Sequence, residues 1–329
     1  MPFPLDRLPD PALKHILHCM TPLELLAISV LSTKLSGIVK SLEIRAEYLE
    51  IKLEGSVTVE GTFQNGYLYI SFPNVGLNGL DGTPRNIEIL DRFDNVDLEW
   101  TSPGAKLRTF LKCISQNFDW YLDGIKLRFC TKHEVLNIET LSKCFVSVTD
   151  TVIEPPCSVE YAQKILKYFR PVTKNIQIYD SLFREPSSSL VQSFLILNHD
   201  NLRIPDIRHA TLDNLLSINA ESIIICRPNF THIGVNRFIK LWIKGGNPRL
   251  KKLEIRHNME NEIYDRNVVM KGFPHQKVGK HVEREFMEER TWGEVIKGGN
   301  DIRSRNGRRA TFLTKKMGNE RRILFLVWD

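Results

Sequence analysis

The feature that most constrains the fold of this chain is an alternation of strand-like and helix-like runs that begins near Asn86. Short runs rich in Val, Ile and Leu recur at intervals of 21 to 30 residues. They begin at Val96, Ile125, Val146, Ile176, Leu202, Ile223 and Leu253. Several intervals contain a helix-like run that ends at Asn or Gly, such as Leu190–Asn198, and these residues tolerate the left-handed conformation at helix ends. A further helix is predicted at Val159–Phe169, which stops before Pro171. This period is typical of a solenoid, in which each unit buries its apolar face against its neighbours.

The fold class that follows from this alternation is α/β. We expect residues 86–329 to form a curved, leucine-rich-repeat-like α/β solenoid, although no unit carries the LxxLxLxxN consensus. A doubly wound α/β domain is the competing interpretation, and it would place a ligand crevice at the strand ends. The chain has neither a GxGxxG fingerprint nor a P-loop to support that alternative.

Three short amphipathic helices are predicted before the repeat, between Pro4 and Leu42. The first repeats apolar residues at i, i+3, i+4 and i+7 from Leu13. The run Thr21-Pro22-Leu23-Glu24 has the residues of a capping box, with Pro at the first helical position. Ser32 is placed to cap a third helix. A unit of this size makes little core alone, and it has more apolar residues than one core face needs, so we expect a partner surface.

This stretch resembles the F-box. The residues that carry the resemblance are Leu8-Pro9, Ile16, Leu25 and the run Ile28-Ser29-Val30-Leu31-Ser32. Many F-boxes have a Trp near the end of the motif, whereas this chain has Gly37-Ile38-Val39 there, as divergent nematode F-box proteins do. The resemblance implies docking onto the Skp-type adaptor of a cullin-RING ubiquitin ligase. The expected adaptor-binding residues are Leu8, Pro9, Ile16, Leu17, Leu25, Ile28 and Leu31. The alternative is a helical subdomain that packs on the rest of the chain.

Three later runs resemble the F-box-associated (type 2) domain of nematode F-box proteins. They are Phe194–Asn198, Leu212–Asn219 and Asn236–Leu250. In that family this domain is taken to bind the substrate. The resemblance therefore implies a non-enzymatic adaptor that recruits an unknown protein substrate for ubiquitination.

Residues 44–85 separate the helices from the repeat and change to a period of two. Asn65-Gly66 lies between two alternating runs and is a strong hairpin signal. We expect a small antiparallel meander here. The predicted domains are a helical F-box domain at 1–43, a β-rich linker region at 44–85 and an F-box-associated α/β repeat domain at 86–329.

Charge offers an alternative function. Between Asp301 and Asp329 there are eight basic and three acidic residues, so this segment holds +5 of the net charge of +6. A basic tail of this kind would suit a solenoid scaffold or a nucleic-acid-binding protein, although a solvated face is the ordinary explanation and nucleic acid is not the partner we expect.

The cellular compartment is indicated by the absence of membrane-spanning runs, a signal peptide and paired cysteines in the sequence. No run approaches the 18 or so apolar residues that cross a bilayer, and no basic segment with a long apolar core marks a signal peptide. The six cysteines are scattered without a CxxC pair, which suits a reducing compartment. We therefore expect a cytoplasmic or nuclear protein without a membrane partner.

Two groups of residues have types and spacings that could carry chemistry, but we expect no catalytic site, cofactor or metal. His15, His18 and Cys19 have a spacing that metals can use, but helix packing explains them. His199-Asp200 with Asp206 and His209 would be needed for a divergent α/β hydrolase or transferase, the second alternative function, but loop residues beside a strand explain them.

One five-residue run occurs twice near the C-terminus. Ile-Lys-Gly-Gly-Asn stands at 243–247 and again at 296–300, and we expect both copies to be exits from a helix to a strand. Either Gly-Gly pair could admit an anion, but turn geometry is sufficient to explain it. Arg256–Arg290 is polar and poorly patterned, so no structure is assigned to it.

Overall fold

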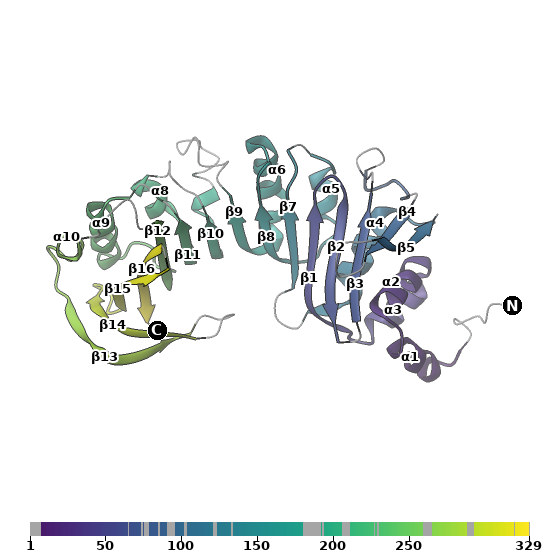
Figure 1. Cartoon of the computed structure of the whole chain (residues 1–329), viewed down its shortest axis with the longest axis horizontal. Coiled ribbons are helices and arrows are strands. Elements are labelled where there is room, and N and C mark those ends of the chain that lie inside the picture. The colour runs from purple at the N-terminus through teal and green to yellow at the C-terminus, as the bar shows by residue number, and fades with distance from the viewer. Residues whose placement is uncertain are drawn as a thin grey trace. The chain divides into compact units, whose positions relative to one another are not determined.

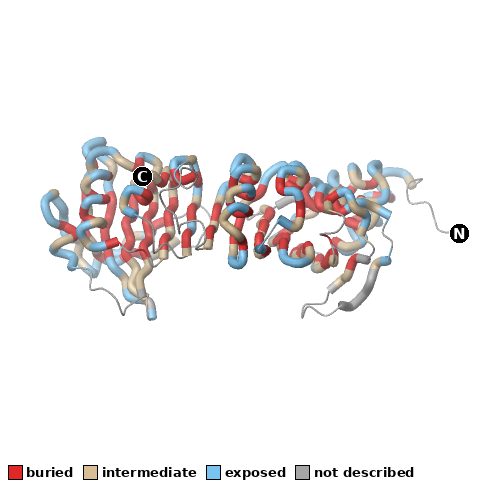
Figure 2. Tube along the Cα trace, turned by 90° about the horizontal axis from the view of Figure 1, so that it is seen from above, coloured by how far each residue is buried: buried red, intermediate tan, exposed pale blue. Residues whose placement is uncertain are grey.

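A computed structural model shows two compact units, unit 1 (Met1–Lys174) and unit 2 (Asn175–Asp329) (Figure 1). The structure describes residues 8–64, 66–73, 75, 79–84, 86–90, 96–101, 104–120, 124–132, 134–179, 192, 194–205, 211–226, 228, 230–258, 265–287, 293–318 and 320–328. In both units the buried residues concentrate in the strands, and the exposed residues lie on the outward sides of the helices (Figure 2). None of the helices in this described part combines the length and the apolar character that crossing a bilayer requires.

The three predicted N-terminal helices of unit 1 are confirmed. They are α1 (Asp10–His18), α2 (Pro22–Leu31) and α3 (Thr33–Lys40). The capping box of α2 forms as expected: Glu24 N donates to Thr21 Oγ1 at 3.3 Å, and Thr21 N donates to Glu24 Oε2 at 2.8 Å. Ser32 caps α3 by accepting from Leu35 N at 3.3 Å. Each cap satisfies backbone donors that the first helical turn leaves without a partner.

We expect Thr21→Ala to lower the free energy of unfolding of unit 1 by about 1 kcal/mol, because the capping box at the start of α2 is lost. Urea unfolding followed by circular dichroism would measure it. Thr33→Ala is the matched control, since Thr33 is exposed and Ser32 supplies the cap of that helix. Equal effects of the two substitutions would contradict this prediction.

The sheet of unit 1 has the strand order β8-β7-β1-β2-β3-β4-β5, and β6 also pairs with β1. Its strands are β1 (Arg45–Leu53), β2 (Val57–Phe63), β3 (Gly66–Phe72), β4 (Asn86–Leu90), β5 (Val96–Thr101), β6 (Asp119–Trp120), β7 (Ile125–Phe129) and β8 (Val148–Ile153). Strands β1 to β5 form an antiparallel meander, whereas β1, β7 and β8 are parallel. The region expected to be a linker, 44–85, therefore supplies β1 to β3 to this sheet and is not separate from it.

Helices α4 (Leu107–Asn117) and α6 (Val159–Phe169) cover the same face of this sheet, and α5 (Ile138–Ser142) lies between them in the chain. Residues that pair directly across neighbouring strands have side chains on the same face of the sheet. Four such partners are Phe129, Leu53, Val57 and Phe72. At one end of this row the ring of Phe72 lies 5.3 Å from Phe110 of α4. At the other end the ring of Phe129 lies 5.4 Å from Phe169 of α6. The core of unit 1 is the layer between them.

The sheet of unit 2 combines parallel and antiparallel halves. The parallel strands are β9 (Thr173–Ile178), β10 (His199–Ile204), β11 (Ala220–Cys226) and β12 (Lys252–Asn258). Helices α8 (Leu212–Ser217) and α9 (His232–Ile243) connect the last three. The antiparallel strands follow β12 in the order β16 (Glu320–Trp328), β15 (Arg309–Met317), β14 (Glu294–Arg303) and β13 (Gln276–Phe286). A short helix, α10 (Arg266–Val269), precedes β13.

The prediction of a mixed α/β chain with N-terminal helices before a large sheet is confirmed. The leucine-rich-repeat-like solenoid is not borne out over 86–329. Parallel strands follow chain order from β7 to β8 and from β9 to β12, but β4–β5 and β13–β16 are antiparallel. The predicted strand at Val146 begins two residues later, at Val148. The predicted helix beginning at Leu190 lies partly outside the described residues.

The repeated run Ile-Lys-Gly-Gly-Asn has two different structures. At 243–247 it ends α9, as expected, and Gly245 has a φ of 106°. At 296–300 the expectation was wrong, because the run lies inside β14. There Gly298 and Gly299 have φ values of 69° and 113° and accompany a bulge between β13 and β14. Arg256–Arg290, which was left unassigned, contains the end of β12, α10 and β13.

Candidate adaptor-docking site

The interior of the N-terminal helices is built from one apolar face of each helix. The fully or almost fully buried residues are Leu13 and Leu17 of α1, Leu25 and Leu26 of α2, and Leu35 and Val39 of α3. Leu13 and Leu17 have the i, i+4 spacing of neighbours on one helix face, and so do Leu35 and Val39. Leu25 and Leu26 are consecutive, so α2 is buried over a wider arc. These residues therefore pack the three helices against one another and against the rest of unit 1.

The helices are fixed to the rest of unit 1 by α4 and β3, both of which contact α2 (Figure 1). Asn117 Nδ2 of α4 donates to Ser36 Oγ of α3 at 2.9 Å. Cys113 Sγ of α4 donates to the carbonyl oxygen of Ser29 at 3.6 Å. Burial raises the pKa of the Cys113 thiol, so it remains a neutral donor in this contact. One side of the helical unit is thus already occupied within the chain.

Five of the seven expected docking residues are accessible to different degrees. Leu31 at the end of α2 is 67 % exposed, and Ile16 of α1 is 37 % exposed. Pro9 is exposed, and Leu8 and Ile28 are half-buried. Ile28 and Leu31 lie three residues apart and share a face of α2. We call these five residues the docking surface: Leu8, Pro9, Ile16, Ile28 and Leu31.

The remaining two expected docking residues, Leu17 and Leu25, have no exposed surface, at 0 % each. They belong to the interior of the helical unit, and the docking surface does not include them. Helical periodicity alone could not separate the two groups. It identifies apolar faces, but it does not say which face meets the chain's own α4 and β3.

The candidate metal and catalytic residues do not come together in the described part of the chain. His15, His18 and Cys19 are exposed, so the packing role expected for them is not seen. Among the described residues no group of three or more His, Cys, Asp or Glu side chains is placed to hold a metal ion. His199 is buried, and its Nε2 lies 3.1 Å from the carbonyl oxygen of Phe194. Asp206 and His209 lie outside the described residues.

The basic C-terminal segment is not a tail, because 301–329 contributes to β14, β15 and β16. Arg308 donates to the carbonyl oxygens of Pro248 and Leu250 at 2.6 Å each. Arg322 pairs with Glu254 at 3.3 Å. These cations therefore serve the fold, which weakens the argument from net charge for a nucleic-acid partner.

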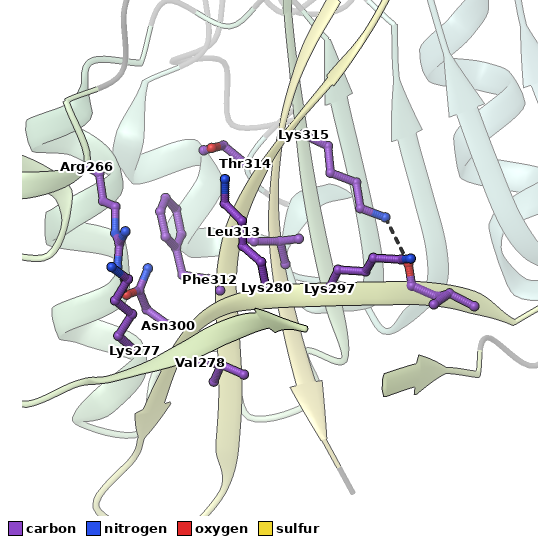
Figure 3. A pocket seen from close by; sticks show the side chains of 12 residues that line it. Arg266, Lys277, Val278, Lys280, Lys297, Asn300, Phe312, Leu313, Thr314 and Lys315 are labelled. Atoms are coloured by element: carbon purple, nitrogen blue, oxygen red, sulfur yellow. Dashed lines mark hydrogen bonds between the residues drawn. The ribbon is translucent and has the colours of Figure 1, made fainter. Parts of the chain in front are cut away.

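A pocket of unit 2 was not predicted from the sequence. It has a volume of about 430 Å³ and is lined by side chains of α10, β13, β14 and β15 (Figure 3). Its cations are Arg266, Lys277, Lys280, Lys297 and Lys315. They are spread over fifty positions of the sequence, and no short motif predicts that they cluster. Gly299, one of the glycines that the sequence marked as able to admit an anion, also lines it.

Comparison with known families gives matches to two parts of the chain. The F-box domain family matches residues 5–47, which include α1 to α3. The F-box associated family matches residues 190–255, which include β10, α8, β11 and α9 and most of β12. No solved structure gives a significant match to the chain.

A relative from Caenorhabditis elegans, the F-box associated domain-containing protein sdz-33, is 25 % identical over 272 residues. The similarity covers 79 % of this chain and 80 % of that protein. F-box domains in general bind Skp-type adaptors of cullin-RING ligases. The match to an F-box domain over α1 to α3 and the match to an F-box-associated domain behind it support a nematode-type F-box protein.

Proposed function

We propose that this chain is a non-enzymatic, substrate-recruiting adaptor of a Skp–cullin–F-box ubiquitin ligase. Its docking surface binds the Skp-type adaptor, and unit 2 binds a protein substrate. The observation that carries the proposal is the exposure of Leu31 and Ile16 on helices whose opposite faces are buried in unit 1. The proposed role places the chain in the cytosol or the nucleus, where its six free cysteines remain reduced.

The physical basis of docking is the removal of apolar surface from water. Covering a large aliphatic side chain contributes roughly 1.5–3 kcal/mol. Leu31 and Ile16 are only partly covered by their own chain, so much of this contribution is still available to a partner.

We expect Ile16→Glu with Leu31→Glu to weaken binding to the Skp-type adaptor by more than 100-fold. Both substitutions place a carboxylate where the partner would cover an apolar side chain, and an unpaired buried charge costs several kcal/mol. Both positions are exposed in the chain, so the helices should still fold. Isothermal titration calorimetry would measure the affinity, and thermal unfolding would verify the fold.

The matched control is Val146→Glu with Ile196→Glu. Val146 and Ile196 are exposed apolar residues outside α1 to α3. This pair makes the same change of charge and should leave adaptor affinity within about twofold. The docking assignment is refuted if the α1–α2 variant binds the adaptor as tightly as the unsubstituted chain.

Co-expression of the full chain with a Skp-type adaptor, followed by size-exclusion chromatography, tests the proposal most directly. A stoichiometric complex is the expected result. If the chain eluted alone in the presence of the adaptor, the helices would only pack against the rest of unit 1 and would not bind the adaptor.

A further inference from the structure

The pocket of unit 2 has an unbalanced charge. Five cations line it, and none of its described lining residues carries a carboxylate. Lys297 pairs with Glu283 at 2.5 Å, and Lys315 pairs with Glu294 at 2.6 Å, so two cations are balanced from outside the lining. Among the residues that the structure describes, Arg266 donates to the neutral amide oxygen of Asn300 and pairs with no carboxylate. Its charge is therefore not balanced by that contact.

The two lysines of β13, Lys277 and Lys280, are exposed and have no ion-pair partner among the residues that the structure describes. Figure 3 shows Lys277 and Arg266 reaching toward Asn300 at one end of the pocket, while Lys315 and Lys297 lie at the other. Lys280 projects between these two groups. A ligand in the pocket would thus meet three cations that the described residues leave unneutralised: Arg266, Lys277 and Lys280.

The backbone of β14 gives the pocket its form. Gly298 and Gly299 have positive φ values, which favour glycine because other residues have a Cβ that clashes there. A Cβ on Gly299 would lie 2.6 Å from Cγ2 of Thr311. The two glycines occur where the register between β13 and β14 shifts, so Lys280 lies in the part of β13 that leaves the regular ladder.

The rest of the pocket suits a polypeptide better than a nucleic acid. Val278, Val295 and Leu313 supply apolar lining for a side chain next to the anion. Phe312, the one aromatic residue of the described lining, is buried and offers no face for stacking a base. Strand β13 is the outer strand of the described sheet, and an outer strand can pair with an extended peptide.

We propose that this pocket binds a phosphorylated serine or threonine in an extended segment of the protein substrate. This inference rests on the proposed function, in which unit 2 recruits the substrate. A phosphoryl group carries about −1.5 to −2 charges at pH 7 and has three acceptor oxygens. It can therefore accept from Arg266, Lys277 and Lys280 at the same time, whereas a carboxylate has fewer acceptor positions for three separate donors.

The test uses the full chain, with and without the Skp-type adaptor. The probe is a fluorescein-labelled degenerate peptide library with one fixed phosphoserine, and binding is measured by fluorescence anisotropy. The same library with serine, the library with glutamate, and a labelled single-stranded oligonucleotide are the comparison probes. We expect the phosphoserine library to bind at least tenfold more tightly than each of these, and inorganic phosphate to compete with it.

Lys277→Gln with Lys280→Gln should weaken binding of the phosphoserine library at least tenfold without changing the thermal midpoint. Lys112→Gln with Lys174→Gln is the matched control. Lys112 and Lys174 are exposed and lie outside the pocket, so this variant removes the same two charges from elsewhere. It should leave affinity within twofold, which separates binding in the pocket from attraction to net charge.

Three outcomes would overturn the pocket proposal: equal binding of phosphoserine and serine libraries, tighter binding of the oligonucleotide, or an unaffected Lys277/Lys280 variant. Adaptor binding is read separately by co-elution. Loss of peptide selectivity with an intact adaptor complex refutes the pocket alone. Selective peptide binding by a chain that ignores the adaptor supports the pocket and refutes the docking proposal.

Discussion

Trp242→Ala should destabilise unit 2 by about 3–5 kcal/mol, the range measured for removing a large aromatic side chain from a core. Trp242 is the largest fully buried side chain in the part of the chain that the structure describes. Its ring lies 4.9 Å from Phe325 of β16 in an edge-to-face arrangement, so it joins α9 to the sheet. The substitution would leave a cavity between the helix and β16, which the surrounding strands can fill only in part.

Hydrogen exchange measured by mass spectrometry would locate the effect. Peptides from β11, β12 and β16 should lose protection in the Trp242→Ala protein, while those from unit 1 keep it. Leu241→Ala is the matched control, because Leu241 is the neighbouring residue of α9 and is exposed. It should change the free energy of unfolding by less than about 0.5 kcal/mol. If the Trp242 and Leu241 variants showed equal protection from hydrogen exchange, the assignment of Trp242 to this core would be contradicted.

Glu50→Ala should destabilise unit 1 by about 3 kcal/mol. Glu50 lies on the face of β1 away from α4 and α6, and its side chain is 4 % exposed. Its Oε1 pairs with Lys126 at 3.0 Å and with Arg128 at 2.9 Å. Removing one member of a buried ion pair costs about 3–5 kcal/mol. The lower end of this range applies because both cations are partly exposed. Arg128 also retains its ion pair with Glu154 at 2.7 Å.

Glu60→Ala is the control for Glu50→Ala. Glu60 pairs with Lys52 of the same network at 3.1 Å, but its side chain is 41 % exposed. Exposed pairs contribute about 0.2–1 kcal/mol, so this substitution should have a small effect. Urea unfolding of both variants would measure the difference. Similar losses from the two substitutions would mean that burial of Glu50 does not matter to the network.

The contribution of Glu50 to the free energy of unfolding should depend on pH. Burial by itself raises the pKa of Glu50, but hydrogen bonds from Tyr48, Lys126 and Arg128 outweigh it and hold the pKa below the usual 4.5. A carboxyl whose pKa is lower in the folded state stabilises the fold above its unfolded pKa. This contribution is lost as the pH falls through the folded pKa. The difference between the unsubstituted chain and Glu50→Ala should therefore shrink below about pH 4.5.

Local structure was predictable wherever periodicity and caps agree. The helix predicted at Val159–Phe169 is α6 with the same bounds, because its apolar residues recur at helical spacing and Pro171 follows it. The capping box at Thr21 marks the start of α2 for the same kind of local reason. The parallel strands from Ile176 onward were also found, since buried strands read as short apolar runs.

Strand β13 was not predicted, because it is an outer strand with most of its side chains exposed. Its residues do not alternate in polarity, and a bulge shifts its register with β14. Because β13 was not predicted, the sequence could not show that the cations of the pocket lie close together. The candidate substrate site of unit 2 was therefore beyond prediction, although the glycines at 298–299 had been marked.

The sequence by itself determined the helices, their caps, most of the strands and the family resemblance, since these depend on residues close together in the chain. Tertiary structure decided which apolar face is free: Leu25 is buried and Leu31 exposed, although both are leucines of α2. It also decided that Ile-Lys-Gly-Gly-Asn ends a helix at 243–247 and lies within a strand at 296–300. In each case the deciding contact comes from a distant segment, which short-range spacing does not encode.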